Sequence, residues 1–146
     1  MDIPEYVTVD EVKRVCKEMG IRDWTGLQTP DVTPEEARTI LDETGTGGMA
    51  IEPEEFRRGL EVELEHGTVF KDANVTNNHP VLTGKIVLAH FKESLDYYRL
   101  LEVAELEGDM VKAAAAGDAK KLLAKYGKLV EAKKELSRAE SARLSR

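Results

Sequence analysis

Two short stretches decide how this chain folds: Glu61-Val62-Glu63-Leu64-Glu65-His66-Gly67 and Gly84-Lys85-Ile86-Val87-Leu88-Ala89-His90-Phe91-Lys92-Glu93. Their apolar residues recur at the three- and four-residue spacing that is typical of an amphipathic helix. Each stretch also holds a glutamate and a histidine three residues apart, and such residues are neighbours on a helix surface. Burying polar groups without partners costs roughly 2–7 kcal/mol each, so we expect the two pairs to converge on each other, on water or on a metal ion.

The pairs Glu63/His66 and His90/Glu93 allow three interpretations. The first is a metal site, because helical di-metal proteins use Glu-x-x-His motifs that project inward from facing helices, and the second pair is the reverse of that motif. Carboxylate and imidazole ligands suit Zn, Fe or Mn better than Ca or Mg, so these ions are the candidate cofactors. The second interpretation is a structural network that ties two helices together, and the third is acid–base catalysis. In the absence of a stronger motif, the structural network is preferred.

Outward from these stretches, helix start and end signals follow one another along the chain. Thr8 and Glu11 have the spacing of a capping box, Pro34 and Pro53 stand where a first helical residue does, and Gly67 stands where a helix ends. No convincing strand pattern and no internal repeat is visible in the sequence. We therefore predict an all-α protein, built as a compact bundle of four or five helices with a C-terminal helical arm.

The centre of this bundle is predicted to be a hairpin of helices over residues 53–66 and 84–107. The loop over residues 68–82 is rich in Asn and Asp, which we expect to bond the local backbone and keep the loop ordered. A helical core domain over residues 1–108 is then followed by an arm over residues 109–146. Apolar side chains recur along the arm at coiled-coil-like steps: Leu122, Tyr126, Leu129 and Leu136. Because an isolated helix is marginal in water, we expect the arm to dock on its own domain or on a neighbouring chain.

Composition narrows the classes of protein to consider. The chain has 146 residues, of which 41% are hydrophobic, and this length is usual for a single domain. It contains no apolar run of about 18 residues, so we expect no membrane span. Its acidic start has no apolar signal core, which predicts a cytoplasmic or virion location and not secretion. A single cysteine, Cys16, cannot form an internal disulfide bond.

The net charge of −7 conceals an asymmetry along the chain. Residues 1–116 hold 12 basic and 24 acidic side chains, a net charge of −12, whereas residues 117–146 hold 9 basic and 4 acidic side chains, a net charge of +5. The acidic body is expected to repel nucleic acid, so we predict no specific nucleic-acid partner. The basic tail favours contact with an acidic surface, either on the same chain or on a neighbour.

The sequence also resembles a family of small uncharacterised helical proteins encoded by bacteria, by tailed phages and by other large DNA viruses. The resemblance covers about half of the chain and is carried by Val9 to Trp24, Glu55 to Gly67, Asn74-Val75-Thr76-Asn77, Thr83 to His90 and Asp96-Tyr97-Tyr98. The resemblance implies a shared fold and shared polar positions. It does not imply a particular activity, because no activity is assigned to the family. Relative to that family, residues 25–52 are an insertion and the arm is an addition, as expected of a protein that has joined an assembly.

The sequence contains no Ser/His/Asp or Cys/His arrangement of a hydrolase, and its glycine-rich Gly45-Thr46-Gly47-Gly48 lacks the Lys-Ser/Thr of a phosphate-binding loop. We therefore predict a non-enzymatic structural or interaction protein, such as a component of a phage particle or of another oligomeric assembly. Its protein partners or its own copies are expected to bind through residues 117–146. The alternative is a helical metalloprotein that binds Zn, Fe or Mn through Glu63, His66, His90 and Glu93.

Overall fold

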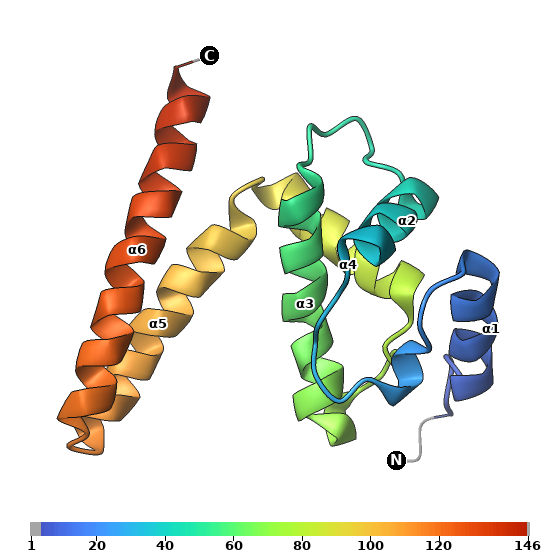
Figure 1. Ribbon diagram of the computed structural model, residues 1–146, viewed down its shortest axis with the longest axis horizontal. Helices are drawn as coiled ribbons and strands as arrows, with labels where there is room; N and C mark the ends of the chain where they lie inside the picture. Colours follow the sequence, from blue (N-terminus) through green and yellow to red (C-terminus); the bar gives the residue numbers. More distant parts are fainter. Residues whose placement is uncertain (1–3, 146) are drawn as a thin grey trace. The chain divides into compact units, whose positions relative to one another are not determined.

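The computed structural model describes residues 4–145, and every regular element within that range is helical (Figure 1). The six α-helices are α1 (Val9–Met19), α2 (Pro34–Thr44), α3 (Pro53–Val69), α4 (Pro80–Glu93), α5 (Tyr97–Ala115) and α6 (Ala119–Leu144). Two short 3₁₀ helices, η1 (Trp24–Gly26) and η2 (Lys71–Ala73), lie in the connections. The all-α prediction is confirmed, but the expected count of four or five helices differs from the six observed.

The extra helix arises because the predicted helix over residues 84–107 is two helices, α4 and α5. Between them, the Ser94 hydroxyl accepts a hydrogen bond from the Asp96 N–H at 3.1 Å, and the Ser94 carbonyl accepts one from Tyr97 N–H at 3.0 Å. Side-chain bonds of this kind compete with the helical ladder and interrupt it. Gly108, where we expected the helix to end, lies inside α5 instead.

The chain divides into two compact units, Met1–Glu93 with α1–α4 and Ser94–Arg146 with α5 and α6. The division between these compact units follows Glu93. The pairing of α5 with α6 places all of α5 in the second unit.

The core of the first unit is made by α1–α4 and by η1. Its largest fully buried side chains are Trp24, Phe56, Ile40, Leu60, Leu64, Val12 and Val87. Gly84 of α4 allows α2 to approach closely, because a Cβ atom at this glycine would lie 2.8 Å from the Ile40 Cγ2 atom and 3.3 Å from the Phe56 Cζ atom. Residues 25–52, which we expected to be an insertion, thus contribute α2 to the centre of this unit.

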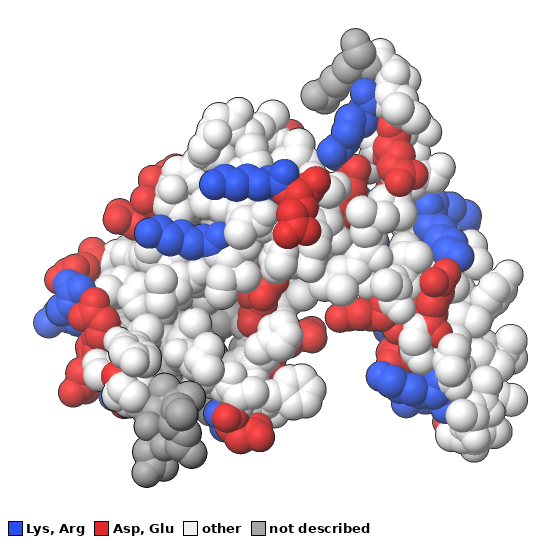
Figure 2. Space-filling model, turned by 180° about the vertical axis from the view of Figure 1, so that it is seen from behind, with Lys and Arg blue, Asp and Glu red and all other residues white. Residues whose placement is uncertain are grey.

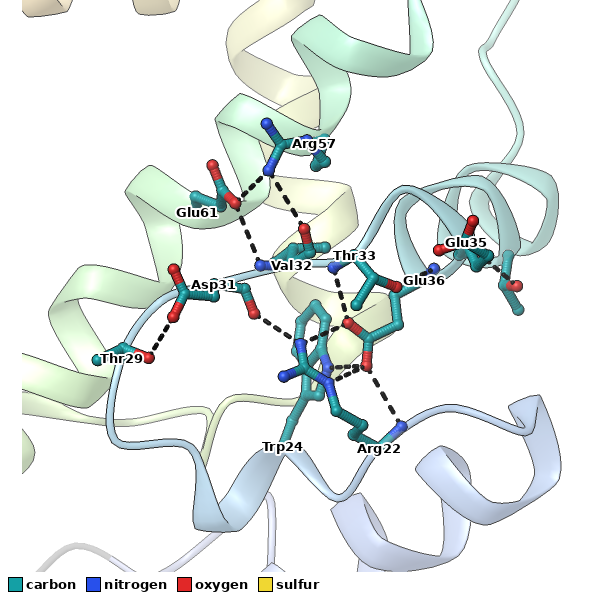
Figure 3. A network of polar contacts seen from close by, with 11 residues as sticks. Arg22, Trp24, Thr29, Asp31, Val32, Thr33, Glu35, Glu36, Arg57 and Glu61 are labelled. Atoms are coloured by element: carbon teal, nitrogen blue, oxygen red, sulfur yellow. Dashed lines mark hydrogen bonds and ion pairs between the residues drawn. The ribbon is translucent and has the colours of Figure 1, made fainter.

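A buried polar network fixes the segment around η1 to α2 (Figure 3). Glu36 is only 4% exposed, and its carboxylate accepts hydrogen bonds from Arg22 Nε at 2.9 Å, Arg22 Nη2 at 2.7 Å and Trp24 Nε1 at 3.2 Å. Its side chain also accepts the Thr33 N–H and so completes the capping box at the start of α2. Burial alone would raise the pKa of Glu36, but the hydrogen bonds from Arg22, Thr33 and Trp24 outweigh it and hold the pKa below its ordinary value.

A second part of this network ties the chain before α2 to α3 (Figure 3). The Val32 N–H donates to Glu61 Oε1 at 3.2 Å, and the Val32 carbonyl accepts from Arg57 Nη1 at 3.2 Å. Both backbone groups of one extended residue are thereby satisfied by side chains of α3.

The second unit is an antiparallel hairpin of α5 and α6, which lie side by side in Figure 1. Its small buried core consists of Leu106, Leu129 and Ala132, with Val103 and Met110 packed against it. Ion pairs that join the two helices set their register: Arg99–Glu135, Asp109–Lys125, Glu107–Lys133 and Asp96–Arg143. The α6 helix therefore packs on α5 through part of the stripe that the sequence indicated, since Leu129 is buried whereas Tyr126 is 54% exposed.

Candidate functional site

The structure brings three of the four candidate Glu/His residues together in the first unit. Glu63 of α3 and His90 of α4 face each other, with 3.4 Å between Glu63 Oε1 and His90 Nε2. His66, one turn further along α3, has its Nδ1 atom 3.9 Å from Glu63 Oε2, and its side chain is 68% exposed. Glu93 is exposed at the last residue of α4. Both histidines thus flank one carboxylate, which is only 11% exposed.

These residues form a polar pair between two helices, with a second histidine at its edge. The separations of 3.4 and 3.9 Å are longer than strong charge-assisted hydrogen bonds. Within residues 4–145, no group of three or more His, Cys, Asp or Glu side chains has an arrangement that could hold a metal ion. The other candidate for chemistry, Cys16, is buried, and burial raises the pKa of its thiol.

A pocket of about 280 Å³ opens beside Glu63. Three of the stretches that carry the family resemblance line it, since the end of α3, the loop around η2 and the start of α4 all contribute. Its polar lining residues are Glu63, His66, Asn74, Thr76, Asn78 and Thr83, and its apolar ones are Leu64, Gly67, Phe70, Ala73, Val75 and Ile86. Phe70 and Val75 are 56% and 84% exposed, so the pocket has apolar side chains open to solvent.

Gly67 makes the floor of this pocket possible. A Cβ atom at this position would lie 1.7 Å from Asn78 Oδ1 and 2.8 Å from Asn74 Nδ2, distances that no side chain can tolerate. The space left by the missing Cβ lets Asn74 donate to Asn78 Oδ1 at 3.1 Å and to the Gly67 carbonyl at 3.4 Å. The glycine that the sequence indicated as a helix end thus lies inside a helix that continues to Val69 and serves close packing instead.

The loop between α3 and α4 is held by contacts with distant parts of the chain. Asn78 donates to the Trp24 carbonyl at 3.2 Å, and Asn77 donates to the Val7 carbonyl at 2.7 Å and to Glu5 Oε1 at 2.6 Å. Both asparagines adopt left-handed backbone conformations, with φ of 48° and 61°. Our expectation that the loop asparagines bond the local backbone is therefore wrong for these two, because their side chains reach the N-terminal segment and η1.

A different kind of surface lies on the hairpin of the second unit. Residues three or four apart share a helix face. By this spacing, apolar residues of both helices lie on one side of the hairpin, which we call the apolar side face. Its residues are Leu100, Val103, Met110, Val111 and Ala114 of α5 and Ala119, Leu123, Tyr126 and Val130 of α6. The ion pair between Glu107 and Lys133, at 2.8 Å, spans this face and shows that both helices contribute to the same side. Val111 and Leu123 are 70% and 72% exposed.

Charged side chains of both signs are interspersed on the surface that Figure 2 shows, where lysines and arginines lie among aspartates and glutamates. No helix within residues 4–145 is long and apolar enough to cross a membrane.

Comparison with known proteins adds one finding. A family model with the description "Protein of unknown function (DUF5661)" matches residues 12–107, which include α2–α4 and all three stretches around the pocket. No curated protein and no solved structure matches the chain.

Proposed function

Since this chain belongs to the DUF5661 family of proteins of unknown function, we propose its role from its own residues: it is a non-enzymatic interaction protein that pairs with a second copy of itself through the α5–α6 hairpin. Such pairing suits a component of an oligomeric assembly, and a phage particle is the setting that the sequence resemblance suggests. The surface used is the apolar side face, which includes the beginning of the stretch over residues 117–146.

The observation that carries this proposal is the exposure of the apolar side face. Val111, Leu123 and Tyr126 are each more than half exposed. Leu123 and Tyr126 are neighbours on one face of α6, and Val111 lies in the last two turns of α5 before the connection to α6. Burying a side chain of this size is worth about 1.5–3 kcal/mol, and contiguous exposed apolar residues are typical of protein interaction surfaces. Val103 and Met110 at the edge of this face pack against the small core of the hairpin, whereas Val111, Leu123 and Tyr126 stay exposed within it.

Charge identifies a second copy as the occupant of this face. The α5 helix carries two basic and four acidic side chains, a net charge of −2, whereas α6 carries eight basic and three acidic side chains, a net charge of +5. Two hairpins that pack face to face about a two-fold axis parallel to their helices place α5 of one copy against α6 of the other, and the opposite charges of the two helices favour this arrangement over one that pairs like helices. The result is a four-helix bundle with apolar contacts inside and opposite charges on adjacent helices.

The molar mass in solution tests the proposal. We expect the wild-type chain to have twice the 16.3 kDa mass of one chain in light scattering coupled to size exclusion, and to dissociate on dilution. Leu123→Glu places a charge in the proposed interface and should yield monomers, because an unpaired buried charge opposes association. Ala124→Glu is the matched control, since this exposed neighbour points about 100° away around α6.

The control should keep the dimer, and both variants should keep the helical content of the wild-type chain. A wild-type chain that stays monomeric up to about millimolar concentration, where even weak pairing is detectable, would contradict the proposal. Equal dissociation of both variants would also contradict it, because the effect would then follow from charge alone and not from the apolar side face.

A further inference from the structure

We propose that the pocket between α3, η2 and α4 is a binding site for an ammonium group carried on a short aliphatic chain, either a free amine or the side chain of a partner's lysine. The ammonium would lie against the Glu63 carboxylate, and the aliphatic chain would lie along the apolar wall formed by Phe70, Val75 and Ile86. This site lies in the first unit and does not depend on self-association of the hairpin.

The charge of the ligand follows from the lining of the pocket. Glu63 is the only acidic residue among the lining residues, and no lysine or arginine is among them. A carboxylate offers about four lone-pair sites, so a bound ammonium can share its oxygens with the neighbouring His66 and His90 rings. The first unit holds 10 basic and 19 acidic side chains, a net charge of −9, which favours the approach of cations over anions.

The apolar part of the ligand follows from the side chains around the carboxylate. Leu64 lies at the buried side, with 1% exposure, while Phe70 and Val75 are 56% and 84% exposed. A partner that covers these two side chains removes apolar surface from water, and the ring of Phe70 also attracts cations through its face. A hydrated metal ion would gain nothing from this apolar wall, whereas an alkylammonium would gain from both the wall and the carboxylate.

The size of the ligand is limited by the pocket volume of about 280 Å³, at the lower end of small-molecule sites. A chain of about four to six carbon or nitrogen atoms, as in butylammonium or the side chain of lysine, fits within this space and leaves room for water. The Asn74 and Asn78 side chains already bond each other and the backbone, and they therefore act as a rigid floor.

Binding is tested by nuclear magnetic resonance titration of the full chain with n-butylammonium. We expect saturable shifts of the backbone resonances of Ala73, Val75 and Ile86, with a Kd in about the millimolar range for so small a ligand. n-Butanol has the same chain without the charge and butyrate has the opposite charge, so both should bind at least about tenfold more weakly. A capped lysine in a parallel titration distinguishes the sources, since tighter binding than butylammonium assigns the pocket to a partner's lysine.

Two variants establish the role of the carboxylate. Glu63→Gln should weaken butylammonium binding by about tenfold or more, because it removes the charge and keeps the shape. Glu65→Gln removes the same charge from an exposed position on α3 that does not line the pocket, and it should change the affinity less than about twofold. Val75→Arg places a cation at the mouth and should also weaken binding, and we expect it to leave folding unchanged because Val75 is 84% exposed.

Several results would overturn the inference. They are the absence of saturable shifts, butyrate or butanol binding as tightly as butylammonium, and equal affinities of the wild-type chain and Val75→Arg. The Val75→Arg result keeps the test decisive even if Glu63→Gln fails to fold.

Discussion

At Glu36, five hydrogen bonds from Arg22, Trp24 and Thr33 meet one carboxylate, three of them from Arg22 alone. The ionised form suits this arrangement because every neighbour is a donor and a carboxylate only accepts. Arg22 is 47% exposed, so its own charge stays in contact with water while that of Glu36 is buried. The buried charge of Glu36 is therefore stabilised by these donors. If the carboxylate were neutralised, several of the donors would be left with a weaker hydrogen-bond acceptor.

We expect Glu36→Gln to lower the free energy of unfolding by about 2–4 kcal/mol at neutral pH, because its amide N–H₂ would face donors where the carboxylate accepts. Chemical denaturation of the wild-type chain and the variant measures the difference. Glu35→Gln is the control: it is exposed in the first turn of α2, and it should cost no more than about 0.5 kcal/mol. A similar loss in both variants would mean that the helix start, and not the buried network, is responsible.

The same comparison has a predicted pH dependence. The pKa of Glu36 is lowered in the folded chain from an ordinary value of 4.5, so the unfolded state binds its proton first as the pH falls. The stabilisation by the carboxylate is therefore complete well above pH 4.5 and is lost as the pH falls through the lower, folded pKa. The stability difference between wild type and Glu36→Gln should shrink over this acidic range. A constant difference would contradict the assignment to this group.

At the scale of elements, Gly84 controls how α2, α3 and α4 pack. The Cβ of an alanine there would approach Ile40 Cγ2 to 2.8 Å and Thr44 Cγ2 to 3.1 Å, so neighbouring side chains must shift. We expect Gly84→Ala to destabilise the chain by about 1–3 kcal/mol despite the higher helix propensity of alanine. Gly127→Ala in α6 meets nothing within 4 Å and should stabilise by up to about 1 kcal/mol. Thermal unfolding of both variants tests this, and a stabilised Gly84→Ala would mean that α2 shifts away without loss.

The sequence predicts the start of a helix correctly where a single capping side chain or a single proline determines that start. Thr8 accepts the Glu11 N–H, and Thr33 with Pro34 opens α2, as the local pattern predicted. The break at Ser94 was not readable, because the apolar spacing continues across it and the hydrogen bonds of a single serine interrupt the helix. The apolar spacing of a sequence does not show whether a serine side chain will bond the backbone two residues ahead, as Ser94 does.

The candidate site was predictable only in part, for a related reason. Helical spacing placed Glu63 and His90 on facing sides of two helices, which is where the structure has them. The same spacing gave no sign that Asn78 reaches Trp24 or that Arg22 reaches Glu36, because these partners are 54 and 14 residues apart. The pocket floor depends on the first of these contacts. Sequence distance of this size carries no local signal.

At the scale of the whole molecule, the chain combines an acidic unit with a pocket and a hairpin with an apolar side face. The hairpin is a separate cooperative element, because its core and its ion pairs lie entirely within residues 94–146. Asp96, only 5% exposed, accepts from Arg99 at 3.1 Å and from Arg143 at 2.8 Å, so the first residues of α5 are tied to the last turn of α6. Each helix of the hairpin therefore depends on the other along its full length.

Deletion of residues 117–146 tests this dependence. The α6 helix has 26 residues and α5 has 19, and in proteins most of the stability of such helices comes from packing against a partner. We expect far-ultraviolet circular dichroism to show a loss of helix per molecule clearly larger than α6 alone accounts for, because α5 unfolds without its partner. The truncated chain should also be monomeric, since the apolar side face needs both helices. A loss confined to the helix of α6 would show that α5 folds without α6, and a truncated chain that still dimerised would place the interface in residues 1–116.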